Sequence, residues 1–326
     1  MMRSLSGSPR PDSPELACFA DISSDLVVAV SRLPKRDGKE SATFVGEFPG
    51  GMGANVAATF VTLGGRAALF SAVGDDERGR RSLADLRATG VNVDGVLTTG
   101  DATFWTIALL DGHGEKSLLE FSTPASSPQW QRLDWSSLDD VKIAYTVGAE
   151  GRNACHLFDE CRRRGIRTAL DLESADLGDE PTLLELLATT DLLFIPAGHA
   201  EVIAKGRPPR VAARALLAAG PAVVAVTLGR RGCIVASAHD TIEVPGHKVS
   251  VLDTTGAGDC FVGAFLFAFN CGCALADCAR LANLMAAQSV TAYGSRGRLL
   301  NPAQLAERPE AANLPILKKL LTQSRR

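Results

Sequence analysis

Residues 253–265 read DTTGAGDCFVGAF and place one aspartate between a glycine turn and an apolar run. Gly256 and Gly258 permit a positive φ and let another group approach the backbone closely. The apolar run after Asp259 predicts a buried helix, so residues 256–259 lie at its N-terminus. Unpaired backbone N–H groups and the positive end of the helix dipole favour an anion there, and phosphate is the usual one. The stretch therefore predicts an anion site.

Asp259 lies beside the position where a phosphate would bind. A carboxylate near a helix N-terminus is expected to stay ionised and can accept a proton. The turn then combines a base with a cradle for transferred negative charge, and phosphoryl transfer to an alcohol requires both. The alternative is that Asp259 only caps the helix, although a cap alone does not require two glycines before it.

A second glycine cluster, PGGMGANVAA, spans residues 49–58. It is not a Walker loop, because no Gly-Lys-Ser/Thr follows, and it lacks the third glycine of a dinucleotide fingerprint. It offers close backbone approach and one amide, Asn55, which can both donate to and accept from a hydroxyl. Asp25, at the edge of a predicted strand pair, can accept from two hydroxyls. These residues suit a polyol better than a nucleobase.

Together, DTTGAGDCFVGAF and the earlier GGMGANVAA resemble the PfkB/ribokinase family of carbohydrate kinases, and the resemblance extends over residues 16–305. It implies that Asp259 is the catalytic base. It also implies an anion hole formed by the backbone amides of Gly256, Ala257 and Gly258. The sugar-binding residues implied are Asp25, Gly51 and Asn55, although the glycine that usually opens the Asp25 stretch is Ala20 here.

The resemblance further implies a nucleotide loop in TLGRRG, residues 227–232, with Thr227, Gly229 and Gly232 bordering ATP. Asn283, in RLANLMAA, matches a position near the adenine. The implied cofactors are ATP and Mg²⁺, with a monovalent cation such as K⁺ near Asp253 as a further candidate. The implied partner is a small-molecule sugar.

One motif of the family departs from the pattern. Where many members carry Asn-x-x-Glu, this chain has Ala197 and Ala200, with Glu201 one residue out of register. Ketohexokinase-like members also depart here, and EGRNA (150–154) resembles a stretch that they carry. The metal ligands are therefore unknown from sequence. Asp171 and Glu173 are candidates to organise magnesium, the alternative being a solvated strand end.

The loop TAYGSRGRLL, residues 291–300, contains two arginines in the region where the family binds a monovalent cation. Arg296 or Arg298 could replace that cation, bind substrate, or be a surface residue. The sequence does not choose between these three interpretations.

Short apolar runs alternate with helical patterns and predict an α/β fold with a doubly wound, mostly parallel sheet of the ribokinase-like type. Strands are expected at 16–20, 26–30, 67–73, 141–147, 166–172, 191–195 and 222–228. Residues 41–48 and 103–121 lack crossover helices and predict a small β-sheet lid, rather than an edge hairpin of the main sheet. The expected division is a disordered lead (1–14), a kinase domain (15–310) and a C-terminal tail (311–326).

Composition excludes several classes. A net charge of −3 and 6% aromatic residues argue against nucleic-acid and anionic-membrane binding. The polar, Ser/Pro-rich start lacks a secretory signal, and no apolar run is long enough for a membrane helix, so a cytoplasmic protein is expected. The eight cysteines are expected to be reduced. Cys271, Cys273 and Cys278 lack C-x-x-C spacing, which favours buried thiols over zinc.

These observations predict an ATP-dependent sugar kinase that transfers the γ-phosphate to a primary hydroxyl of a ketohexose or pentose-type sugar. The alternatives are a catalytically weak sugar- or nucleotide-binding regulator on the same scaffold, and a nucleoside kinase. A nicotinamide-dependent oxidoreductase is remote, because the first strand is not followed by G-x-G-x-x-G. The sugar and the oligomeric state stay open, although a protruding lid offers a surface through which two copies could form a homodimer.

Overall fold

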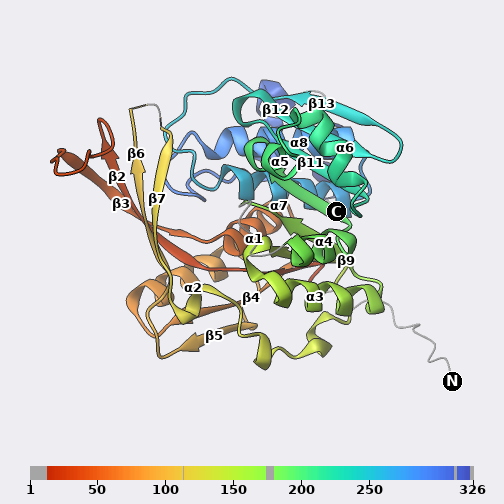
Figure 1. Cartoon of the computed structure of the whole chain (residues 1–326), viewed down its shortest axis with the longest axis horizontal. Coiled ribbons are helices and arrows are strands. Elements are labelled where there is room, and N and C mark those ends of the chain that lie inside the picture. The colour runs from red at the N-terminus through yellow and green to blue at the C-terminus, as the bar shows by residue number, and fades with distance from the viewer. Residues whose placement is uncertain (1–12, 113, 174–179, 312–313, 324–326) are drawn as a thin grey trace.

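A nine-stranded sheet with the order β13-β12-β11-β10-β9-β8-β1-β4-β5 runs through the molecule (Figure 1). The computed structural model describes residues 13–112, 114–173, 180–311 and 314–323. Neighbouring strands from β5 to β11 are parallel, and β12 and β13 add an antiparallel edge. The strands are β1 Leu16–Phe19, β4 Ala67–Gly74, β5 Val96–Thr99, β8 Ile143–Val147, β9 Arg167–Asp171, β10 Leu192–Pro196, β11 Val223–Thr227, β12 Gly232–Ser237 and β13 Thr241–Pro245.

Helices cover both faces of this sheet, which confirms the doubly wound expectation. Successive strand residues point to opposite faces, and β1 shows this directly. Leu16 and Cys18 join one apolar core, whereas Ala17 and Phe19 join the other. The first core is closed by α1 Met52–Thr62, α7 Ala257–Asn270 and α8 Leu275–Ser289; the second by α3 Gly151–Arg164, α4 Glu180–Ala188 and α6 Pro209–Leu217. The remaining α-helices among the described residues are α2 Glu77–Thr89, α5 Ala197–Ile203, α9 Pro302–Ala306 and α10 Pro315–Gln323.

A separate four-stranded sheet, the lid, projects from one side of the molecule (Figure 1). Its order is β3-β2-β6-β7, and its strands are β2 Ser23–Val30, β3 Ala42–Gly50, β6 Trp105–Leu110 and β7 Lys116–Phe121. β2 and β6 are parallel, and the other two pairs are antiparallel. Both segments expected to form a lid therefore do so.

Two strand expectations were incomplete. The strand at 26–30, expected in the α/β core, belongs to the lid as part of β2. Parallel pairing with β1 needs a crossover of a dozen or more residues, and only residues 20–22 separate the two strands. The antiparallel hairpin of β12 and β13 was not predicted at all.

Other expectations concern the two ends of the chain and its cysteines. Residues 1–12 of the expected disordered lead lie outside the described residues. In the expected tail, α10 packs on the first core through the buried side chains of Ile316 and Leu317. The eight cysteines all fall within the described residues and are free thiols. Among the helices that the structure describes, none is both long and apolar enough to cross a membrane.

Helices α1 and α7 pack with very little space between them. A Cβ atom added at Gly263 of α7 would lie 2.7 Å from the Thr59 Cβ and 2.7 Å from the Val56 carbonyl oxygen of α1. Any side chain at this position would push the two helices apart. The glycine therefore allows the N-terminal turns of α1 and α7, which carry the two sequence motifs, to come together.

Candidate active site

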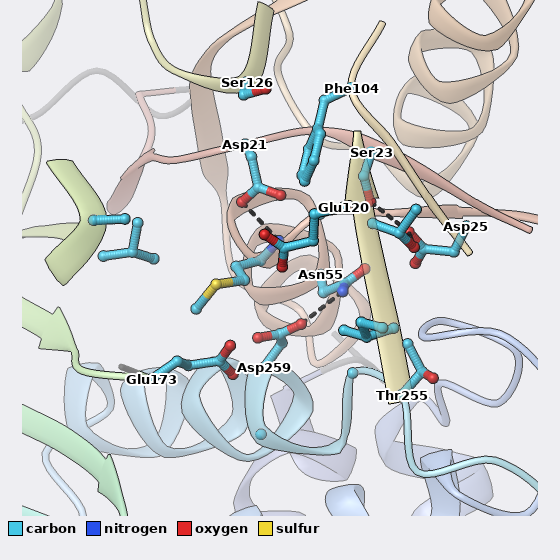
Figure 2. A pocket seen from close by; sticks show the side chains of 18 of the residues that line it. Asp21, Ser23, Asp25, Asn55, Phe104, Glu120, Ser126, Glu173, Thr255 and Asp259 are labelled. Atoms are coloured by element: carbon cyan, nitrogen blue, oxygen red, sulfur yellow. Dashed lines mark hydrogen bonds between the residues drawn. The ribbon is translucent and has the colours of Figure 1, made fainter. Parts of the chain in front are cut away.

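A cavity of about 270 Å³ lies between the lid and the main sheet (Figure 2). Three strands of the lid, β2, β6 and β7, contribute to its lining. Most of the rest comes from the segments after β1, β8 and β9 and from the starts of α1 and α7. β1 is flanked by β8 on one side and β4 on the other, so the strand order reverses there. Ligand sites of α/β sheets occur at such a reversal, outside the carboxyl ends of the strands.

The start of α7 contributes the glycine turn. Gly256 has φ 74°, and a Cβ there would lie 2.4 Å from the Ser295 Cβ, so this position requires glycine. A Cβ at Gly258 would meet only the Glu173 Oε1 within 4 Å, at 3.7 Å, which shows that the backbone here borders open space. Asp259 is the third residue of the helix and is buried. The predicted placement of residues 256–259 at a helix N-terminus is therefore observed.

Asn55, in the first turn of α1, points at Asp259. Its Nδ2 donates a hydrogen bond to the Asp259 Oδ2 at 2.6 Å, and Figure 2 shows this contact between the two helix starts. Both side chains are buried and line the cavity. The two glycine-containing motifs of the sequence are thus joined by one short hydrogen bond.

The carboxylates around Asp259 are electrostatically crowded. Oxygen atoms of Asp171, Glu173 and Asp259 all lie within 4.8 Å of one another. Burial, reinforced by the Glu173 charge, raises the pKa of Asp259 well above its ordinary value; the Asn55 hydrogen bond and the Lys116 charge oppose this. Burial also raises the pKa of Asp171, with Glu173 and Asp259 adding to the effect. Burial and the Glu173 charge therefore oppose the ionised form of Asp259 that its place at the helix N-terminus led us to expect.

Asp25, in β2, is buried on the cavity side of the lid. The hydroxyls of Ser23 and Thr106 donate to its Oδ1 at 2.7 and 2.9 Å. A Cβ added at Gly50 would meet the Asp25 Oδ2, so this second oxygen lies against bare backbone. Both described donors therefore bind Oδ1, and none of the described hydrogen bonds ends on Oδ2.

Four charged residues of the lining were missed by sequence reasoning: Asp21, Lys116, Glu120 and Glu150. Asp21 directly follows the segment expected as the first strand. Because ligand sites lie at the carboxyl ends of strands, the sequence alone could have indicated Asp21. Lys116 and Glu120 lie on the same face of β7, but KSLLEF shows no polar–apolar alternation that would reveal this face. Glu150 begins EGRNA, a stretch that resembles one in ketohexokinase-like members but did not indicate that Glu150 lines the cavity.

Two of these carboxyl groups have altered acidity. Burial raises the pKa of Asp21 to about 7, although the Met52 backbone N–H donates to it at 3.0 Å. Burial also raises the pKa of Glu150, whose Oε2 accepts from the Ser127 hydroxyl at 2.7 Å and the Trp130 Nε1 at 2.8 Å. The cavity thus contains several buried acidic groups with few cationic partners.

The residues expected near ATP do not line this cavity. Thr227 ends β11, and Gly229 begins the short turn that Gly232 ends with φ 99°. Asn283, in α8, donates through its Nδ2 to the carbonyl oxygens of Val244 and Pro245 at 3.0 and 3.2 Å. These residues form a separate group next to the β12–β13 hairpin.

The remaining candidates also lie outside the cavity. Ala197 and Ala200 are in α5, directly after β10, and Glu201 follows in the same helix. Arg298 donates to the Thr291 hydroxyl at 3.1 Å. Arg296 has a side chain only 7% exposed, so its interpretation as a surface residue was wrong.

Comparisons with known proteins agree with this geometry. The model of the pfkB family carbohydrate kinases matches residues 13–301. Mouse (Mus musculus) ribokinase is 29% identical over 294 residues, which cover 83% of this chain and 87% of the mouse protein.

Solved structures show the same fold. Arabidopsis thaliana ribokinase complexed with ribose and ATP has a TM-score of 0.74 at 22% identity, covering 90% of this chain and 98% of that one. A Vibrio cholerae fructokinase double mutant, with fructose, ADP and potassium bound, has a TM-score of 0.74 at 24% identity, covering 91% and 98%. The chain therefore belongs to the pfkB family of carbohydrate kinases, ribokinase-like enzymes that phosphorylate sugar hydroxyl groups.

Proposed function

We propose that this chain is an ATP-dependent kinase that transfers the γ-phosphate to the primary hydroxyl of an uncharged sugar, of ketohexose or pentose type, with Asp259 as the base. The observation that carries the proposal is the placement of Asp259. It lies at an open glycine turn of a helix N-terminus, bonded to Asn55, in a cavity that also contains Asp25. A base, a phosphate cradle and hydroxyl acceptors then share one space.

Each residue has a separate role in the proposed reaction. Asp25 Oδ2 and the Asn55 amide hold hydroxyls of the sugar, with Gly51 close beneath it. The primary hydroxyl faces Asp259, which accepts its proton late, once the loose transition state has acidified it. The backbone N–H groups of residues 256–258 receive the negative charge of the transferred group. Lys116, whose charge partly offsets the raised pKa of both Asp25 and Asp259, adds a cation on the lid side.

Magnesium is the expected metal, and the donor set fits it. Asp171, Glu173 and Asp259 offer closely spaced oxygen ligands, which Mg²⁺ prefers, directly or through water. A bound Mg²⁺ supplies positive charge to the nucleotide phosphates and favours the ionised form of the three carboxylates. These three carboxylates would organise the magnesium ion in place of the Asn-x-x-Glu motif that this chain lacks.

ATP would bind beside TLGRRG, with Thr227, Gly229 and Gly232 at its border and Asn283 near the adenine. A monovalent cation such as K⁺ remains a proposal for the loop around Asp253, whose carboxylate accepts the N–H groups of Thr255 and Gly294 and so joins two segments. Turnover in potassium compared with potassium-free buffer tests this part.

The charge of the cavity favours an uncharged acceptor. Lys116 is the one cationic side chain among the described residues that line it, against the carboxyl groups of Asp21, Asp25, Glu120, Glu150, Glu173 and Asp259. In a partly buried site, such an excess repels a sugar acid or a sugar phosphate. Phe104 is the one aromatic lining residue described, so a nucleoside base has little to stack on. A sugar is therefore favoured over a nucleoside.

The alternative of a weak binding regulator rests on the missing Asn-x-x-Glu. Against it, Asp259 has no evident use in a protein that only binds. ADP formation that depends on an added sugar separates the two proposals.

The first prediction concerns the base. Asp259→Asn keeps the side-chain shape and loses the proton acceptor, so kcat should fall about 10²–10⁴-fold, the range for a positioned base. Asp277→Asn is the matched control, because Asp277 is also the third residue of its helix but lies outside the cavity. Steady-state kinetics and ATP titration of both variants make the comparison. Near-normal turnover of Asp259→Asn would contradict the assignment of Asp259 as the base.

The second prediction concerns the acceptor. Asp25→Ala removes a charged hydrogen-bond acceptor worth about 1.5–3 kcal/mol, so sugar affinity should fall roughly 10- to 150-fold. ATP affinity measured without sugar should not change. Calorimetric sugar titration of the folded variant, with a melting curve, checks this. A lowered Tm with unchanged sugar binding would instead make Asp25 a structural residue.

The third prediction concerns acceptor charge. Each accepted sugar should be phosphorylated with a kcat/KM at least about 10-fold higher than the matched acid, in which a carboxylate replaces a non-reacting hydroxymethyl group. Glu120→Gln should lower the ratio of kcat/KM for the sugar to kcat/KM for the matched acid, because it removes one repelling charge from the lid. A wild-type preference for the acid would contradict the proposed substrate class.

The lid also supports a proposed homodimer. Its face away from the cavity carries apolar side chains that are half-buried or exposed: Leu26, Val28, Phe44, Ile107, Leu109 and Leu119. Phe44 and Leu119 are 64% and 52% exposed. A continuous apolar sheet face of this kind marks an interaction surface, and a second copy of the same lid offers a matching one.

The fourth prediction tests this pairing. Leu119→Glu places a charge on the edge strand β7 within the proposed interface and should convert a dimer into a monomer in sedimentation velocity. Thr43→Glu, on the opposite face of β3, should leave the dimer intact. A wild-type chain that sediments as a monomer at micromolar concentration would refute the interface.

A further inference from the structure

Arg296 is buried beside the candidate active site without lining its cavity. Its Nη1 donates to the Asn55 Oδ1 at 3.0 Å and to the Gly50 carbonyl oxygen at 3.4 Å. Its Nη2 donates to the Asp85 Oδ2 at 2.9 Å. The guanidinium is therefore separated from any substrate by Asn55, and the earlier interpretation of Arg296 as a substrate-binding residue has no contact to support it.

The contact with Asn55 fixes the direction of that amide. A guanidinium can only donate hydrogen bonds, so the group that faces it must be the amide oxygen. The Ser295 hydroxyl also lies 3.1 Å from the Asn55 Oδ1, but it lies 3.1 Å from the Pro49 carbonyl oxygen too and carries one proton for both. Arg296 is thus the donor that is always directed at Asn55.

The opposite orientation of the amide is doubly unfavourable. It would place the Nδ2 donors against the guanidinium and the Oδ1 against the Asp259 carboxylate. In the observed orientation, the amide accepts from Arg296 and donates to Asp259 at 2.6 Å. A chain of contacts from Arg296 through Asn55 therefore ends on the proposed base.

Asp85, in α2, holds the other side of the guanidinium. Its side chain is 42% exposed, whereas that of Arg296 is 7% exposed. A buried arginine needs a paired carboxylate, and the planar guanidinium can bond two partners in a fixed geometry. The ion pair therefore anchors Arg296 in the direction that reaches Asn55.

We propose that Arg296, anchored by Asp85, is a positioning residue for phosphoryl transfer: it fixes the Asn55 amide so that its Nδ2 holds the Asp259 carboxylate in line with the acceptor hydroxyl. The inference rests on the proposed function of Asp259. It adds that the geometry of the base depends on a charged residue that touches neither substrate nor reacting atoms. Because misplacement of a reacting group is costly, the effect appears in kcat.

The first test compares two arginines of one loop. Arg296→Met keeps an unbranched chain but no donor, and should lower kcat about 10- to 100-fold with little change in ATP affinity. Arg296→Lys keeps the charge and a donor and should recover part of this loss. Arg298→Met is the control, because Arg298 bonds Thr291 and lies outside the cavity; its kcat should stay within about twofold of wild type.

A double-mutant cycle shows whether Arg296 acts through Asn55. In an Asn55→Ala background, Arg296→Met should change kcat by less than about twofold, because the group that it positions is already absent. An equal loss in both backgrounds, or a wild-type kcat for Arg296→Met, overturns the proposal. If Arg296→Met does not fold, Asp85→Asn is the second variant: it should lower the Tm, because the buried guanidinium loses its paired carboxylate, and lower kcat several-fold in the folded protein. An unchanged kcat contradicts the anchor.

Different outcomes contradict the proposed base and the proposed positioning residue. Near-normal turnover of Asp259→Asn removes the proposed base and leaves the positioning role without the group that it would position. An inactive Asp259→Asn beside a fully active Arg296→Met removes only the positioning role.

Discussion

The 2.6 Å hydrogen bond from Asn55 to Asp259 is the interaction around which the site is arranged. It joins the N-terminal turns of α1 and α7, and those helices can approach because Gly263 has no side chain to hold them apart. The main sheet delivers Asp171 and Glu173 from one side, and the lid delivers Asp25 from the other.

This arrangement concentrates negative charge where water is scarce. Burial raises the pKa of Asp21, Asp25, Asp171 and Asp259, and the neighbouring carboxylates reinforce one another. Such a cluster is unfavourable in the empty protein and becomes favourable when cations enter with the substrates. In the proposed enzyme, a bound Mg²⁺ would relieve the repulsion between these carboxylates, and that relief would add to the affinity for the metal.

Sequence reasoning predicted the α/β class, the lid and the helix start at Asp259, because these depend on local signals such as apolar periodicity and glycine turns. It misplaced the strand at 26–30, whose sheet is decided by the length of a connection rather than by its own residues. It missed Lys116 and Glu120, because only the pairing of β7 with β6 decides which face looks into the cavity. It could not place Arg296, whose contacts with Asp85 and Asn55 join residues far apart in the chain.

The partners of the Asn55–Asp259 bond are separated by 204 positions in the chain. A ribosome therefore completes α1 long before it synthesises the helix against which α1 packs. Until α7 emerges, the side of α1 that packs against α7 has no permanent cover, and the growing chain must keep it from unrelated surfaces. The two residues of this hydrogen bond come together only after α7 has been made, so a chain that terminates before α7 lacks the proposed base.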